Sequence, residues 1–121
     1  MSDQFGRTID EALVADGRYL RLVTRGRRTG RSRVVVVGYA EEVDGSFLIA
    51  ATDPDAAWAM NLLHDGHAEV AIADRVLAVA AEPLDGAEHA LAVRSLILRY
   101  GTPSEGLGRG PSFRLRPLGS D

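Results

Sequence analysis

Four consecutive valines at positions 34–37 constrain the fold more than any other feature of this chain. The branched Cβ of valine restricts its rotamers in a helix and suits the pleated surface of a β-sheet. These valines lie within the segment 33–40, and their unbroken apolar run is typical of a strand that is covered on both faces. We therefore expect a β-rich domain that buries this strand.

Other short apolar or alternating segments predict further strands. They span residues 19–24, 46–51, 69–73, 76–82 and 113–116. Asp44-Gly45 is a typical hairpin turn, and a second hairpin is expected about Asp74-Arg75. Consecutive strands joined by such short turns are antiparallel.

Three segments are expected to be helical, namely residues 3–17, 53–65 and 86–100. Asp53 can cap the second helix at its N-terminus, and Gly101 can end the third. The predicted order is helix, three strands, helix, two strands, helix and strand, which lacks the regular alternation of a Rossmann sheet. The pattern indicates a mainly β domain with helices (α+β), built as a small antiparallel barrel of about six strands.

Length and composition limit the class of protein. A chain of 121 residues suffices for one domain, which we expect over residues 1–121 with its core at 18–118. The absence of cysteine excludes disulfides, thiolate zinc sites and a cysteine nucleophile. His64 and His67 have no third ligand nearby, so no metal site is expected. No apolar run reaches the roughly 18 residues of a membrane span, and no signal-peptide pattern is present, so we expect a cytoplasmic protein.

The charge of the chain is distributed unevenly. Residues 18–33 hold seven arginines and no acidic residue, so this segment carries +7 while the net charge is −3 and the remainder sums to −10. Such asymmetry predicts an anionic partner. The alternative is a solvated basic face that pairs with acidic residues elsewhere. Nucleic acid is not the expected partner, because the sequence pI is about 5.6 and few aromatic residues accompany the arginines.

Within this segment, residues 26–33 (Gly-Arg-Arg-Thr-Gly-Arg-Ser-Arg) form a candidate binding turn. Gly26 and Gly30 would let the backbone approach a ligand closely. Arg28 and Arg33 could clamp phosphate or carboxylate oxygens, and Thr29 could add a hydroxyl hydrogen bond. The alternative is a flexible basic hairpin loop without a ligand.

Trp58 and Asn61 form a second candidate pair, because their spacing places them on one face of the predicted second helix. The only tryptophan of the chain could stack on a planar ring, and the amide of Asn61 could bond to that ring. The alternative is a tryptophan packed in the core with Asn61 at the surface.

These features together resemble the deazaflavin (F420)-dependent nitroreductase family, within the split β-barrel flavin-binding superfamily. The segment 19–33 resembles the opening strand of that family and its Gly-Arg-Lys-Ser-Gly-x-x-Arg turn. The resemblance continues through Ala50-Ala51-Thr52 to Trp58-x-x-Asn61-Leu62, and covers about residues 18–118. No single motif is decisive; the ordered set carries the resemblance. It implies a split β-barrel of the FMN-binding type.

The resemblance also implies a cofactor and its site. The family cofactor F420 is an 8-hydroxy-5-deazaflavin with a phosphate and an oligoglutamate tail, which would account for the basic segment. Arg28 stands in place of the turn lysine, Thr29 in place of its serine, and Val36 where a proline is common. The implied cofactor-binding residues are Arg27, Arg28, Thr29, Gly30, Arg33, Val36, Ala50, Thr52, Trp58 and Asn61.

The function implied is an oxidoreductase that transfers a hydride from reduced F420 to a small electrophilic substrate whose identity the sequence does not specify. Because the cofactor supplies the chemistry, no catalytic side chain is singled out. One alternative is an FMN-binding protein of the flavin-reductase type, and another is a non-enzymatic binder of a cofactor or small molecule. A homodimer is also implied, and an apolar face such as the valine run would gain from pairing.

Overall fold

The structure is a computed structural model that describes residues 11–101 and 107–118. Its strands are β1 (Leu20–Arg25), β2 (Ser32–Val37), β3 (Ala40–Glu41), β4 (Phe47–Ala50), β5 (His67–Ile72), β6 (Arg75–Leu84) and β7 (Ser112–Pro117). Its helices include α2 (Ala57–His64) and α3 (Gly86–Tyr100). Residues 11–15 are also helical, which confirms that part of the helix expected at 3–17; residues 3–10 lie outside the described residues.

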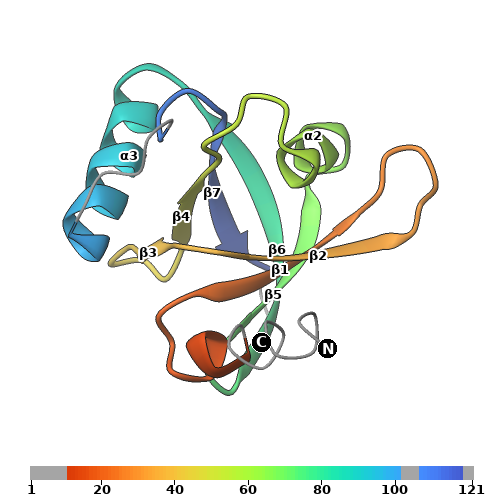
Figure 1. The fold of residues 1–121 in the computed structure, drawn as a ribbon, viewed down its shortest axis with the longest axis horizontal. Coiled ribbons are helices and arrows are strands. Elements are labelled where there is room, and N and C mark those ends of the chain that lie inside the picture. The colour runs from red at the N-terminus through yellow and green to blue at the C-terminus, as the bar shows by residue number, and fades with distance from the viewer. Residues whose placement is uncertain (1–10, 102–106, 119–121) are drawn as a thin grey trace, which may run out of the picture.

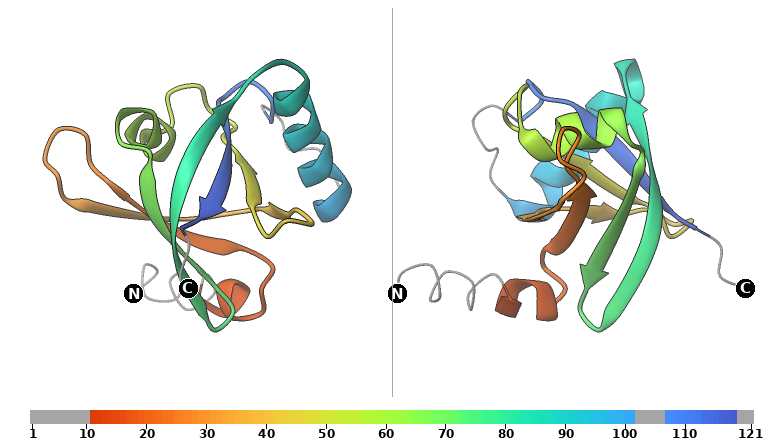
Figure 2. Two further views of the ribbon diagram at one scale, coloured as in Figure 1. Left: turned by 180° about the vertical axis from the view of Figure 1, so that it is seen from behind. Right: turned by 90° about the vertical axis from the view of Figure 1, so that its right-hand side faces the viewer.

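The seven strands form one antiparallel sheet in the order β2-β1-β5-β6-β7-β4-β3. The two edge strands, β2 and β3, are consecutive in the chain and are separated only by Gly38 and Tyr39. So short a connection between opposite edges requires the sheet to curl on itself, as Figures 1 and 2 show. The predicted antiparallel split barrel is confirmed, with seven strands in place of about six.

The concave face of the sheet holds the hydrophobic core. Side chains of a strand alternate between the two faces, and the buried core residues come from the inward positions. They include Leu20, Leu22, Phe47, Ile49, Val70, Ile72, Val79, Phe113 and Leu115. Helix α2 contributes Ala59 and Leu62 to the same cluster. Helix α3 packs beside β4 and β7, on the outer side of the sheet (Figure 1).

The valine run forms a strand as predicted, but its predicted burial is wrong. Strand β2 lies at the sheet edge, and none of the four valines is fully buried. Val34 is 62% exposed, because it lies on the outer face opposite Val23. Gly38 follows β2, and the ring of Tyr100 would lie within 3.0 Å of a Cβ at this position.

The second predicted helix begins later than expected. Helix α2 starts at Ala57, because Asp53 does not act as its cap but accepts a hydrogen bond from the backbone N–H of Asp55 at 2.9 Å within a turn. The third helix matches its predicted bounds, and Gly101 ends it in the left-handed conformation with φ +85°. The hairpin between β5 and β6 turns at Ala73 and Asp74, one residue earlier than predicted. Across the described residues, no helix is long and apolar enough to span a membrane.

Candidate functional site

The turn between β1 and β2 has a defined structure. The N–H of Gly26 donates to the carbonyl of Arg31 at 2.7 Å, and the N–H of Gly30 donates to the carbonyl of Gly26 at 2.8 Å. The hydroxyl of Thr29 accepts a hydrogen bond from the N–H of Arg31 at 3.2 Å. Gly30 has φ +74°, a conformation that favours glycine. The glycines therefore build a tight turn that carries the arginines.

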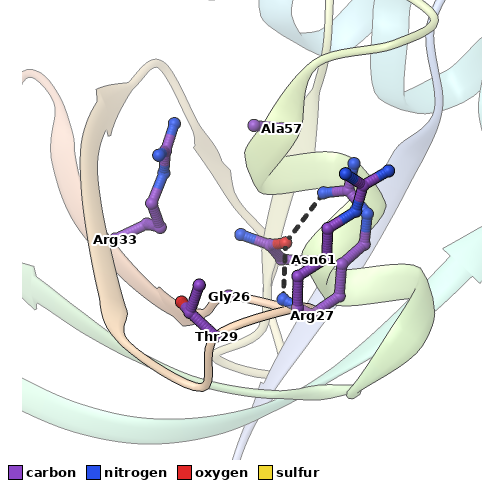
Figure 3. A pocket seen from close by; sticks show the side chains of 7 residues that line it. Gly26, Arg27, Thr29, Arg33, Ala57 and Asn61 are labelled. Atoms are coloured by element: carbon purple, nitrogen blue, oxygen red, sulfur yellow. Dashed lines mark hydrogen bonds between the residues drawn. The ribbon is translucent and has the colours of Figure 1, made fainter.

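Helix α2 holds this turn through Asn61. The side-chain Oδ1 of Asn61 accepts two hydrogen bonds from Arg27, one from the backbone N–H at 3.2 Å and one from Nη1 at 3.1 Å (Figure 3). Its Nδ2 donates to Oγ1 of Thr24 on β1 at 3.1 Å. Asn61 is buried, so its polar side chain joins the turn, the helix and the sheet.

A cavity of about 340 Å³ opens between this turn and the start of α2. We call it the arginine pocket, and it is lined by Gly26, Arg27, Arg28, Thr29, Arg33, Ala57 and Asn61. Arg33 pairs with Thr24 in the β1–β2 register, so the two side chains lie on the same, inner face. In Figure 3, Arg33 extends from β2 on the opposite side of the pocket from Arg27.

The electrostatics of the arginine pocket suit an anion. In the described part of the chain, the ion pairs of arginines involve Arg75, Arg114 and Arg116, and none involves an arginine of the turn. Helix α2 begins at Ala57 on the pocket wall, without a side-chain cap or an acidic residue in its first turn. The partial positive charge of a helix N-terminus therefore adds to that of the guanidinium groups. Phosphate and carboxylate are the groups that such donors bind best.

Five of the predicted site residues come together at the arginine pocket: Arg27, Arg28, Thr29, Arg33 and Asn61. Ala57 also lines the pocket, although it was not among the predicted residues, and its small side chain leaves room at the start of α2. The sequence did not indicate Ala57 as a site residue, because the helix was expected to begin four residues earlier, at Asp53.

Three other predicted residues, Gly30, Thr52 and Trp58, are not part of the pocket wall. Gly30 lines a neighbouring cavity on the other side of the turn. Thr52 is exposed in the connection between β4 and α2. Trp58 is partly buried and packs against the core, with its ring centroid 6.0 Å from that of Phe113. The placement of Trp58 matches the core alternative, whereas Asn61 is buried and not at the surface.

Val36 and Ala50 are placed away from the arginine pocket by strand alternation. Val36 pairs with Arg21 on the outer face of the sheet, whereas Arg33 lies on the inner face. Ala50 lies on β4 next to Ile49, whose side chain enters the core, so Ala50 faces the opposite side. Neither residue can reach the pocket without a change of strand register.

The two predicted histidines line the neighbouring cavity of about 490 Å³, together with Arg25 and Arg27. His67 bonds to Asp65 through Nδ1 at 3.2 Å, and this bond holds the pKa of the Asp65 carboxyl below its usual value. Within the residues that the structure describes, no group of three or more metal-ligating side chains is found.

The chain is similar to a known protein family and to several solved structures. A family model described as F420H(2)-dependent quinone reductase matches residues 4–102. No curated protein matches the chain.

Several solved structures share the fold. An F420-H2 dependent reductase (FDR-A) is 20% identical with a TM-score of 0.65, over 82% of this chain and 94% of the other. A protein described as a domain-swapped dimer is 20% identical with a TM-score of 0.66, over 96% and 100% of the chains. The heme storage protein HutZ from Vibrio cholerae is 16% identical with a TM-score of 0.63, over 93% and 90%. At these identities the similarity shows the split-barrel fold, which serves several functions.

Proposed function

The chain belongs to the F420H(2)-dependent quinone reductase family, and from this membership we propose that its arginine pocket binds the anionic part of F420. The family match also confirms the F420-dependent oxidoreductase expected from the sequence. Hydride transfer to an electron-accepting substrate is the chemistry that reduced F420 supplies when bound. The part of the protein is to bind the cofactor and to orient it.

The observation that carries this proposal is the pair Arg28 and Arg33 in one cavity without an acidic partner among the described residues. Two guanidinium groups provide planar, multiple donors that fit phosphate or carboxylate oxygens. The hydroxyl of Thr29 accepts a hydrogen bond from the turn and can still donate its proton to an anion. The chemistry of this donor set therefore fits the phosphate or the tail of F420.

The size of the arginine pocket limits how much of the cofactor it can hold. About 340 Å³ is at the lower end of the range for ligand sites. The pocket therefore suits the anionic part, and the deazaflavin ring would extend beyond it. Roles for Val36, Ala50, Thr52 and Trp58 at the ring stay predictions.

For the substrate, we propose a quinone, because the matching family model carries that activity. A nitro compound, as the expected nitroreductase would use, is the second candidate to test. Both accept a hydride with a proton from solvent, so the cofactor could serve either. Turnover of each compound with reduced F420, followed by the loss of substrate absorbance, distinguishes them.

The experiment that tests the cofactor is a titration of the purified protein with F420 and, separately, with FMN. Quenching of Trp58 fluorescence reports binding, because Trp58 is the only tryptophan and lies on α2 beside the arginine pocket. Saturable binding of F420 alone is the expected result. Binding of FMN alone would move the protein to the flavin alternative, and binding of both without turnover of any acceptor would favour a non-enzymatic binder.

We also propose that the protein is a homodimer, assembled through the outer face of the sheet. Val34 and Val76 are 62% and 66% exposed on this face. Val23 and Val36 lie next to Val34, whereas Arg21 and Ala71 lie between Val36 and Val76. Contact of these exposed valines with a second copy would remove their apolar surface from water. A two-fold axis would bring each patch against its copy.

A further inference from the structure

We propose that Asn61 and Thr24 are positioning residues, which act on the ligand through the arginine turn. This inference rests on the proposed function of the arginine pocket and adds the buried groups that maintain its shape. Asn61 lies on α2 and Thr24 lies on β1. Both residues are only 2% exposed. Neither therefore offers much surface to a ligand.

Asn61 holds both the backbone and the side chain of Arg27. Its Oδ1 accepts from the backbone N–H of Arg27 at 3.2 Å and from the guanidinium Nη1 at 3.1 Å. The backbone bond places the start of the turn, and the side-chain bond orients the guanidinium along the pocket wall (Figure 3). A guanidinium has five N–H donors, so Arg27 keeps others for an anion.

Thr24 orients the side-chain amide of Asn61. An amide side chain can rotate to exchange its oxygen and nitrogen, and the partners decide which orientation is stable. The Nδ2 of Asn61 donates to Oγ1 of Thr24 at 3.1 Å. This bond directs Oδ1 toward Arg27, so a change at Thr24 acts on Arg27 through Asn61.

The turn between β1 and β2 needs the hydrogen bonds from Asn61 to hold its position. The β1–β2 hairpin extends beyond the rest of the sheet in Figure 1. The other hydrogen bonds found within residues 26–31 close the turn on itself and do not join it to a helix. Among the described residues, Asn61 thus provides the hydrogen-bonded link between the turn and α2.

The test compares Thr24→Val with Thr24→Ser. Valine keeps the shape of threonine but removes the acceptor, which leaves the buried amide nitrogen of Asn61 without a partner. Serine keeps the hydroxyl and serves as the matched control. We expect Thr24→Val to weaken F420 binding about ten-fold, because small displacements of positioned groups have effects of this order. Thr24→Ser should bind F420 nearly as well as the unchanged chain.

A second readout does not need the cofactor. Exchange of the Arg27 amide hydrogen, which is bonded to Asn61, should be faster in Thr24→Val and unchanged in Thr24→Ser when measured without ligand. A folded Thr24→Val protein with unchanged exchange and unchanged F420 affinity would overturn the positioning role. If the unchanged chain does not bind F420, the proposed function fails, and the exchange comparison still decides whether Thr24 and Asn61 hold the turn.

Discussion

Arg114 and the arginines of the pocket differ in their surroundings. Arg114 is 8% exposed and is bonded at 2.7 Å by both Glu42 and Glu88. Arg28 and Arg33 lie in a cavity with no carboxylate partner among the described residues. A buried cation that is already neutralised serves the fold, whereas a cation in an open cavity is available to a ligand.

Arg114 should therefore matter for stability more than for binding. Replacement of Arg114 by methionine removes the shared partner of Glu42, Glu82 and Glu88 and should lower the free energy of unfolding by about 2–4 kcal/mol. Arg116→Met is the matched control on the same strand, since its pairs at 3.6 and 3.8 Å are exposed and worth at most about 1 kcal/mol. Urea unfolding measures both, and equal losses would contradict the assigned role of Arg114.

The same ion pairs predict a dependence of stability on pH. The hydrogen bond from Arg114 holds the pKa of Glu42 below its ordinary value of 4.5. A lowered carboxyl pKa stabilises the folded state above the unfolded pKa, and this stabilisation is lost as pH falls through the folded pKa. The free energy of unfolding should thus decrease as pH falls below about 5. Glu42→Gln should show a smaller decrease than the unchanged chain, and an equal decrease would contradict this contribution.

At the scale of elements, the sequence predicted those helix ends that depend on nearby residues. Helix α3 matches its expected bounds, because its apolar spacing and Gly101 act within a few residues. Helix α2 begins late, because the side chain of Asp53 bonds within a turn instead of capping the helix. The edge position of β2 depends on pairing with distant strands, so the valine run alone could not predict its exposure.

The sequence predicted the arginine turn of the candidate site but not the contacts that hold it. Two glycines and the arginines around them indicated the turn, and the structure places Arg28 and Arg33 in one pocket. Strand alternation could have separated Val36 from Arg33, since an odd spacing puts them on opposite faces. The bond between Asn61 and Thr24 spans 37 residues and has no sequence signal.

The connection between β2 and β3 should require glycine at position 38. A Cβ there would lie 3.0–3.2 Å from carbon atoms of the Tyr100 ring. Gly38→Ala should therefore lower the free energy of unfolding by about 1–3 kcal/mol through overpacking. Chemical denaturation measures this loss. As the control, Gly38→Ala is also made in a Tyr100→Leu protein, where it should lower the free energy of unfolding by less. An equal cost in both backgrounds would mean that the ring contact is not the cause.

At the scale of the whole molecule, the curled sheet separates two surfaces with different properties. The inner side of the β1–β2 hairpin and α2 surround the arginine pocket, while the outer face of the sheet carries Val23, Val34, Val36 and Val76. Arg21 and Glu69 lie among these valines. Across a two-fold axis, they provide opposite charges that could pair between copies.

The proposed dimer is tested by a charge on that outer face. Val34→Lys should shift the protein toward the monomer, because it would bury a lysine charge at the interface. Val43→Lys is the control, as Val43 is fully exposed in the turn between β3 and β4. Light scattering after size exclusion measures the mass of each. A monomeric unchanged chain at micromolar concentration, or a dimer that survives Val34→Lys, would contradict this interface.

The binding of F420 at the arginine pocket is tested most directly by its dissociation constant in two variants of one hairpin. Arg33→Ala and Arg31→Ala each remove one positive charge from an exposed residue, but only Arg33 lines the pocket. Arg33→Ala should weaken binding about ten-fold or more, as expected for a lost charge-assisted hydrogen bond. Arg31→Ala should have a much smaller effect, which salt suppresses. Equal effects of the two variants, or no effect of Arg33→Ala, would contradict binding at this pocket.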